Sequence, residues 1–378
     1  MSEKKGRLRE VAKLFFKLGC IAFGGPAAHI AMMEEEVVNK RKWMDRQHFL
    51  DLVGATNLIP GPNSTEMTMH CGHVRAGRAG LFVAGISFIF PAVVITGVLA
   101  WLYVMYGQLP QVKPFVYGIK PAVLSIIAAA IVKLGKKALK NWELGILGVG
   151  VLTASLLGIN EIFALLSAGL LGTFYFHSKH KFKKENLKSF LPFIFANTTT
   201  VGITAITTLK IFWTFLKVGA ILYGSGYVLF AYLDAEVVSL GWLTRQQLLD
   251  AIAVGQFTPG PVLSTSTFIG FQLGGFWGSL AATAGIFLPS FFLVLILNPL
   301  VPKMRKSKIL SAFLDSVNVA AVAVMLAVLF KMGKATLVDW KTIVIAALGA
   351  GLTFGFKKVN SMMIVAGGSL LGFLLHLI

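Results

Sequence analysis

Residues 251–302 contain no Asp, Glu, Lys or Arg. This uncharged stretch is longer than the roughly 20 residues that a helix needs to cross a hydrocarbon core of about 30 Å. Similar apolar stretches recur along the chain, in which 56% of the residues are hydrophobic and only 13% are charged. Soluble domains are about a quarter charged. The sequence therefore predicts an all-α, polytopic integral membrane protein and excludes a single membrane anchor.

Basic residues are concentrated between the apolar stretches. Lys and Arg total 35 against 16 for Asp and Glu, a formal charge of +19 that would suggest nucleic-acid binding in a soluble protein. Here the positive-inside rule explains the charge as an orientation signal. The lysine-rich segments 133–140 and 177–188 are predicted to be cytoplasmic, as is the uncleaved N-terminus. We expect a multi-pass protein of the plasma membrane, with no nucleic-acid partner.

The second half of the chain repeats the first half, which indicates a tandem duplication. The order and spacing of the paired residues persist over most of each half. We expect a first repeat at 1–188, a linker at 189–209 and a second repeat at 210–378. Matching positions include Phe15 and Phe215, Lys17 and Lys217, Trp43 and Trp242, Pro60-Gly61-Pro62 and Pro259-Gly260-Pro261, Pro91 and Pro289, and Trp142 and Trp340.

The relative orientation of the repeats depends on residues 190–209, which are uncharged and have no counterpart before the first repeat. A crossing there would invert the second repeat, which would place the basic segment 303–308 in the cytoplasm. We therefore favour inverted repeats, as found in many transporters, with ten to fourteen crossings in total. The alternative is an interfacial 190–209 and parallel repeats. The first repeat fits crossings at 14–33, 46–76 (broken), 79–107, 115–132, 144–158 and 160–176.

The two Pro-Gly-Pro motifs lie inside apolar segments. Proline lacks a backbone N–H and clashes with the preceding turn, so neither segment can be one continuous helix. Broken backbone at membrane depth is tolerated where it is buried in protein or lines a cavity. We expect two half-helices at each break, with Pro62 and Pro261 in the first position of the second half-helix. The alternative is that both motifs are tight hairpins without a functional role.

A helix N-terminus has free amides and about half a positive charge, which makes each second half-helix a candidate anion site. In inverted repeats the two ends would face one substrate near the bilayer midplane, and a doubly charged oxyanion suits them. The glycines that interrupt the first span of each repeat are also candidate binding residues. The alternative is that these small residues serve helix packing. The candidate binding residues are Gly24, Gly25, Pro60, Gly61, Pro62, Asn63, Ser64, Thr65, Gly224, Gly226, Pro259, Gly260, Pro261, Ser264 and Thr265.

Four basic residues near the broken segments are candidates for an electrostatic funnel that concentrates anions. The alternative is that they snorkel to the interface or pair with Asp51 and Asp250. These candidates are Lys17, Arg46, Lys217 and Arg245.

Glu66 follows Pro62 by four residues, and the second repeat has no acidic counterpart. An intramembrane carboxylate is a candidate for proton coupling. Alternatively, Glu66 lies in a wet vestibule and pairs with Arg75 or Arg78.

Motifs for catalysis or cofactor binding are missing from the sequence. It has no GxxxxGK[ST] phosphate loop, no metal-ligand spacing among its His and Cys residues, and no nucleophile-base set. We therefore expect no cofactor, no metal site and no enzymatic activity.

Phe23-Gly24-Gly25-Pro26, Trp43, the first Pro-Gly-Pro motif and the glycine-rich stretch that ends at Pro91 resemble the chromate ion transporter family. The second half repeats this order, as in the two-domain form of that family, but Tyr223-Gly224-Ser225-Gly226 lacks the proline. The resemblance implies chromate efflux across the cytoplasmic membrane, driven by an ion gradient, with sulfate as a related anion.

The resulting prediction is a secondary transporter in which one repeat rocks against the other. Two alternatives remain: a transporter of sulfate or another anion, and an anion channel of the same architecture. The expected partners are the oxyanion and the lipid bilayer, with a proton or another coupling ion and a homodimeric assembly left open.

Overall fold

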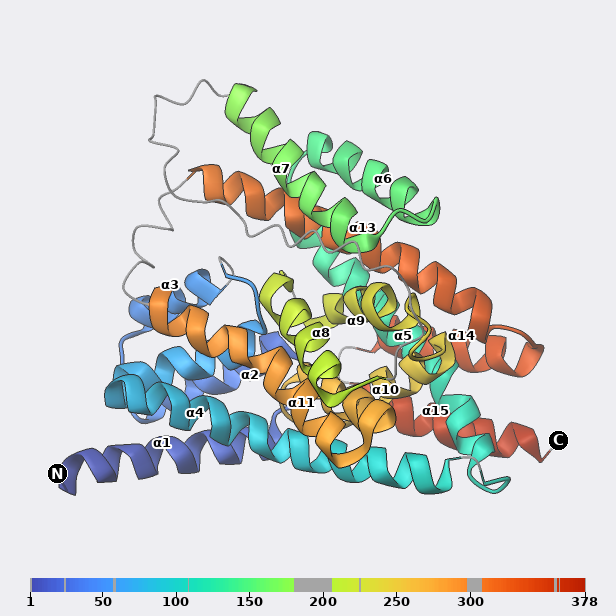
Figure 1. Ribbon diagram of the computed structural model, residues 1–378, viewed down its shortest axis with the longest axis horizontal. Helices are drawn as coiled ribbons and strands as arrows, with labels where there is room; N and C mark the ends of the chain where they lie inside the picture. The colour runs from blue at the N-terminus through green and yellow to red at the C-terminus, as the bar shows by residue number, and fades with distance from the viewer. Residues whose placement is uncertain are drawn as a thin grey trace.

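The computed structural model describes residues 2–23, 25–56, 59–107, 109–179, 206–223, 226–297, 308–356, 359 and 361–377. Regular structure in these ranges is helical (Figure 1). The first repeat contains α1 (Ser2–Ile21), α2 (Pro26–Glu34), the π-helix η1 (Glu35–Lys40), α3 (Arg46–Thr56), α4 (Asn63–Tyr106), α5 (Lys113–Ala138), α6 (Trp142–Leu156) and α7 (Glu161–Lys179). The second contains α8 (Thr208–Ile221), η2 (Gly226–Val228), α9 (Leu229–Leu233), the π-helix η3 (Asp234–Val238), α10 (Arg245–Phe257), η4 (Val262–Ser264), α11 (Thr265–Leu297), α13 (Lys308–Thr336), α14 (Trp340–Gly355) and α15 (Ser361–His376).

Several helices can cross a membrane. Four in the described residues are long and apolar enough to do so, at Asn63–Tyr106, Lys113–Ala138, Val262–Ile296 and Ser311–Thr336, and four shorter apolar helices accompany them. Large apolar side chains of α4, including Ile86, Val98 and Met105, are exposed on the surface. Such a surface suits contact with lipid. The chain is a polytopic all-α membrane protein. The expected crossing at 190–209 and the basic segment 303–308 fall largely outside the described residues.

The helices α1 and α2 form a hairpin. His29 Nε2 donates to the carbonyl oxygen of Ala22 at 3.0 Å, and Lys17 Nζ lies 3.7 Å from Glu36 Oε1. The first contact joins residues close to the break and the second joins residues farther from it on both sides. The chain after the break therefore runs back along α1. The single crossing expected at 14–33 is therefore wrong, since the chain enters and leaves at the same end.

The helix α3 and the first arm of α4 form a second hairpin around the first Pro-Gly-Pro break. At its open end Arg46 Nε lies 3.0 Å from Glu34 Oε1, and Arg75 Nη2 lies 2.7 Å from Glu10 Oε2. Both contacts reach the open end of the α1–α2 hairpin. Residues 46–76 therefore re-enter rather than cross, which corrects the second expected crossing. We call this end of the molecule the first-repeat end.

The helix α4 reverses direction at Ala76 and Gly77, whose φ and ψ angles are −141° and 21°, and 65° and −155°. A Cβ atom added to Gly72 would lie 2.3 Å from the carbonyl oxygen of Gly80, so the two arms pack backbone against backbone. The second arm, 78–106, is the spanning helix. The helix α11 reverses in the same way at Gly274 and Gly275.

The second repeat builds equivalent hairpins from the opposite end. Lys217 Nζ lies 2.7 Å from Glu236 Oε1, and Arg245 Nε lies 3.1 Å from Asp234 Oδ1. Figure 1 shows the long arms of α4 and α11 running in opposite directions, and these helices pack against each other. Because equivalent helices cross in opposite directions, the repeats are inverted, as the charge pattern predicted. We call the mouth of these hairpins the second-repeat end.

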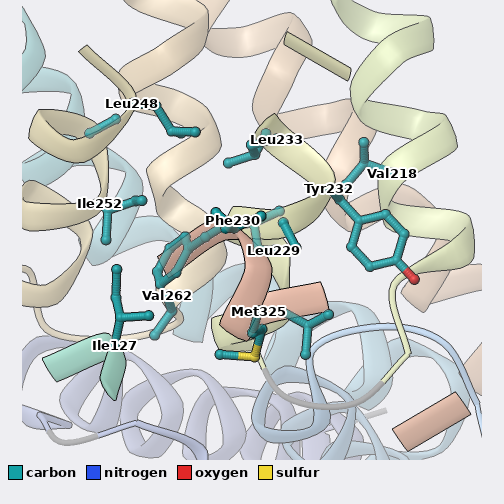
Figure 2. Packing of buried hydrophobic residues seen from close by; sticks show 14 of the residues in the cluster. Ile127, Val218, Leu229, Phe230, Tyr232, Leu233, Leu248, Ile252, Val262 and Met325 are labelled. Atoms are coloured by element: carbon teal, nitrogen blue, oxygen red, sulfur yellow. The ribbon is translucent and has the colours of Figure 1, made fainter. Parts of the chain in front are cut away.

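The remaining helices are exchanged between the repeats. The helix α5 packs against α14 and α15, whereas α13 packs against α6 and α7. At the start of α14 the Tyr117 hydroxyl donates to Asp339, and this hydrogen bond holds the pKa of Asp339 below its ordinary value. Figure 2 shows Phe230 of α9 near Ile127 of α5 and Val262 of η4. The hydrophobic core therefore joins both repeats.

Candidate functional site

The chain breaks of the two repeats meet at the centre of the molecule. The Gly61 amide donates to the carbonyl oxygen of Leu222 at 2.7 Å, and the Gly260 amide donates to that of Ala22 at 2.9 Å. These two bonds are equivalent, because Gly61 and Ala22 align with Gly260 and Leu222. Each Pro-Gly-Pro break is thus bonded to the first break of the other repeat.

Only glycine fits the middle of each motif. Gly61 has a φ of 138° and Gly260 a φ of 90°. A Cβ atom on Gly61 would lie 2.1 Å from Glu66 Oε1 and 2.5 Å from Ser290 Oγ, and one on Gly260 would lie 2.9 Å from Ala92 Cβ. The motif therefore requires both the positive φ and the missing side chain.

Each motif ends one residue before the next helix. Pro62 and Pro261 have extended backbone, with ψ angles of 97° and 130°, and they occupy the N-cap position. Their carbonyl oxygens accept the first helical bonds, from Thr65 at 2.8 Å and from Ser264 at 2.9 Å. The prediction that these prolines are the first helical residues is wrong by one position. The N-cap position, like the first helical position, does not need a backbone N–H, so proline is tolerated there as well.

The two half-helix starts differ chemically. Ser64, Thr65, Ser264 and Thr265 are all buried, as are both Pro-Gly-Pro motifs, whereas Asn63 is half-buried. Thr65 Oγ1 makes no hydrogen bond, whereas Thr265 Oγ1 donates to the carbonyl oxygen of Val262 at 2.8 Å. Buried Gly25 and Gly226 flank the breaks of the first spans, and Gly24 and Gly224 lie outside the described residues.

Glu66 lies in the first turn of α4 and is 0% exposed. Ser290 Oγ approaches its carboxyl group, but neither side chain makes a hydrogen bond of good geometry. The wet vestibule is therefore wrong. Pairing with Arg75 or Arg78 is wrong as well, since neither carboxyl oxygen of Glu66 has a hydrogen-bond partner and Arg75 binds Glu10.

The four funnel candidates lie at the hairpin mouths, away from the breaks. Their acidic partners occupy equivalent positions in the two repeats, so the same ion pairs join elements at the hairpin mouths of both repeats. The pairs are Lys17 with Glu36, Arg46 with Glu34, Lys217 with Glu236, and Arg245 with Asp234. The alternative pairing of these four residues with Asp51 and Asp250 is therefore wrong. Asp51 accepts from Gln47 at 3.1 Å, and Asp250 accepts from Tyr103 at 2.6 Å.

Three side chains at the breaks were not selected from the sequence. His29 donates to the carbonyl oxygen of Ala22 that also accepts from Gly260. Thr96 Oγ1 donates to Ser264 Oγ at 3.2 Å, and Ser290 faces Gly61. A lone histidine or hydroxyl in an apolar helix carries no motif, so only the folded arrangement of the breaks reveals these residues.

Metal ligation finds no support in the described part of the chain, where no group of three or more His, Cys, Asp or Glu side chains could hold an ion. Cys20 and Cys71 are free thiols.

Two inverted repeats with paired broken helices at their centre define a membrane transporter architecture. The family model described as "Chromate transporter" matches residues 9–173 and 209–373, which are the two repeats. The chain belongs to the chromate transporter family.

Full-length relatives carry the same description. A probable chromate transport protein of Synechococcus elongatus is 33% identical over 368 residues, which cover 95% of this chain and 93% of the relative. A chromate transport protein of Cupriavidus metallidurans is 31% identical over 376 residues, covering 97% and 92%. An uncharacterised transporter of Bacillus subtilis is 25% identical over 162 residues, 42% of this chain but 91% of its own length, so a single repeat also exists as a separate chain. No solved structure matches the chain.

Proposed function

We propose that this protein is a secondary transporter that exports small inorganic oxyanions, chromate above all, across the plasma membrane by alternating access. The full-length relatives named for chromate transport support the substrate. The observation that carries the proposal is the reciprocal pair of bonds from Gly61 to Leu222 and from Gly260 to Ala22. A substrate bound where these breaks meet would be controlled by both repeats, as alternating access requires.

Amides, hydroxyls and helix dipoles would hold the anion. In the present state the Gly61 and Gly260 amides are occupied by carbonyl oxygens. Opening one break would free its amide at the positive end of a half-helix, where Ser64 and Thr65, or Ser264, supply hydroxyl groups. Such a site releases its anion without breaking a tight ion pair.

Glu66 would couple transport to a proton. Its Oε1 atom lies against Gly61 at the N-terminal end of α4. An ionised Glu66 would interact with the positive end of that helix itself and would repel a dianion. A protonated Glu66 would leave the helix end available and would not repel the dianion. Binding of the oxyanion is therefore linked to a proton on this carboxyl group.

The membrane potential would favour export. Moving a dianion outward gains about 4.6 kcal/mol per 100 mV of inside-negative potential, twice the value for one charge. The positive-inside rule assigns the lysine-rich segment 133–140 and the N-terminus to the cytoplasm, which is the side of uptake in this proposal.

Uptake of labelled chromate into inverted membrane vesicles tests the proposal. Saturable uptake, its competition by sulfate and its response to a pH gradient are measured for wild type, Glu66→Gln and Glu35→Gln. We expect Glu66→Gln to lose the response to the gradient, and the exposed Glu35 variant to keep it. Uptake of another oxyanion without chromate would refute the chromate assignment, and ion currents far above transporter turnover would identify a channel.

A further inference from the structure

A second buried ionic group lies between α4, α5 and α10. The Asp250 side chain is 4% exposed, its Oδ2 accepts from the Tyr103 hydroxyl at 2.6 Å, and the same oxygen lies 3.5 Å from Lys120 Nζ. Asp250 Oδ1 is buried and makes no hydrogen bond. Lys120 keeps 17% of its side chain exposed. The carboxylate is thus incompletely satisfied, while its lysine partner remains within reach of the surface.

Polar side chains recur along the contact of α4 and α10 between this group and the central breaks. Thr96 and Tyr103 are two turns apart on one face of α4, about 10.5 Å along the axis. Thr96 Oγ1 contacts Thr258 Oγ1 at 3.4 Å just before the second Pro-Gly-Pro motif, and Tyr103 contacts Asp250 farther back on α10. We call these four residues the α4–α10 seam. It places polar pairs at two levels between the breaks and the second-repeat end, with apolar Ala100 and Val254 between them.

The aligned positions of the first repeat are different. Ile59 and Val294 align with Thr258 and Thr96, and both belong to one buried apolar cluster. Asn318 aligns with Lys120. Of the two aligned seams in the described residues, the one at the second-repeat end has threonines where the other has Ile59 and Val294, and its Asp250 contacts Lys120.

Resting on the proposed oxyanion transport, we propose that Lys120 is an oxyanion-binding residue between the breaks and the second-repeat end. Asp250 is the internal anion that pairs with it when no substrate is bound. The Lys120 ammonium and the Tyr103 hydroxyl donate hydrogen bonds. A tetrahedral dianion can accept these bonds in place of the Asp250 carboxylate. The substrate displaces Asp250, and the return of Asp250 expels the substrate, so no unpaired lysine charge is left in the membrane.

Kinetics of chromate uptake in proteoliposomes test this exchange. In Asp250→Asn the lysine has no competing carboxylate, and we expect the KM for chromate to fall about tenfold, equivalent to ~1.4 kcal/mol. In Lys120→Gln we expect the KM to rise by a similar factor of about ten. Asp51→Asn is the matched control, because Asp51 aligns with Asp250 but its repeat has Asn318 in place of the lysine; its KM should stay within about twofold of wild type.

A double variant keeps the test decisive if the Lys120→Gln protein misfolds with an unpaired buried carboxylate. Lys120→Gln/Asp250→Asn removes both charges, which buried ion pairs generally tolerate better than the loss of one partner. We expect it to lose the gain in affinity seen in Asp250→Asn. A wild-type KM in Asp250→Asn, or a gain that persists in the double variant, would overturn the role of Lys120 while oxyanion transport stands. A folded wild-type protein that transports no oxyanion would overturn the proposed function as well.

Discussion

At the scale of single residues, Gly61 and Gly260 combine a backbone requirement with a packing requirement. Each has a positive φ, and each places its amide on a carbonyl oxygen of the other repeat. Glu66 and Ser290 occupy the space beside Gly61. A side chain there would disturb the buried carboxyl group and the contact between the repeats together.

We expect Gly61→Ala to destabilise the protein strongly. The positive φ alone costs about 1–3 kcal/mol for a residue with a Cβ atom. The overlap with Glu66 and Ser290 adds a further overpacking cost of about 1–3 kcal/mol. Thermal unfolding of the detergent-solubilised protein measures the loss. Gly150→Ala in α6 is the control, since no atom beyond its own stretch of helix lies within 4 Å of the added methyl group; equal unfolding temperatures for both variants would contradict the requirement.

At the scale of elements, the reversals in α4 and α11 turn single apolar stretches into a short arm and a spanning arm. Gly72 approaches Gly80, and Gly270 approaches Gly278, so that glycine pairs join the arms in both repeats. A hydropathy profile measures the length of an apolar stretch but not its direction. For this reason the sequence did not predict that residues 46–76 return to the end from which they started.

Substitution of these glycines should separate the arms. In Gly72→Ala the new methyl carbon would lie 2.3 Å from the Gly80 carbonyl oxygen, and in Gly270→Ala the Gly278 carbonyl oxygen lies at 2.3 Å. We expect each variant to lose about 1–3 kcal/mol of stability through overpacking. The fraction of protein that stays monodisperse after heating reports the effect. Gly351→Ala, with no neighbour within 4 Å, should behave as wild type; a similar loss there would argue against a specific role for the glycine pairs.

At the scale of the whole molecule, the exchange of helices means that neither repeat completes its own packing. The helix α5 depends on α14 and α15 of the second repeat, and α13 depends on α6 and α7 of the first. The ion pair between Lys331 and Glu161, with 2.7 Å between Nζ and Oε1, also joins the repeats. The boundaries expected at 188 and 210 divide the sequence, but the packing crosses them.

A protein split between residues 180 and 205 tests this dependence. We expect the two halves to be recovered as one complex when they are expressed together, and to aggregate when each is expressed alone, because each then exposes an unpaired spanning helix. Co-purification through a tag on one half provides the measurement. A first half that is monodisperse by itself would contradict the prediction.

The sequence predicted the features that depend on local chemistry or on the duplication. Proline and glycine marked the breaks, and the unequal charges of equivalent loops predicted inversion. It did not predict features that require the chain to fold back, such as the pairing of Arg46 with Glu34 or the approach of Ser290 to Glu66. The predicted position of Pro62 was wrong by one residue. Both the N-cap and the first helical position tolerate a residue without a backbone N–H, so the sequence could not distinguish them.

Under the proposed alternating access, the unlike pairs Thr96–Thr258 and Ile59–Val294 have a further consequence for the two access states. Two identical inverted halves would give inward-facing and outward-facing forms of equal free energy, since each form would be the other turned over. A polar seam can exchange its hydrogen bonds for water when it opens, whereas an apolar seam must expose hydrocarbon surface to water. The transporter without substrate would then rest open toward the second-repeat end. Divergence of the two repeats after duplication would thus give the two access states unequal free energies.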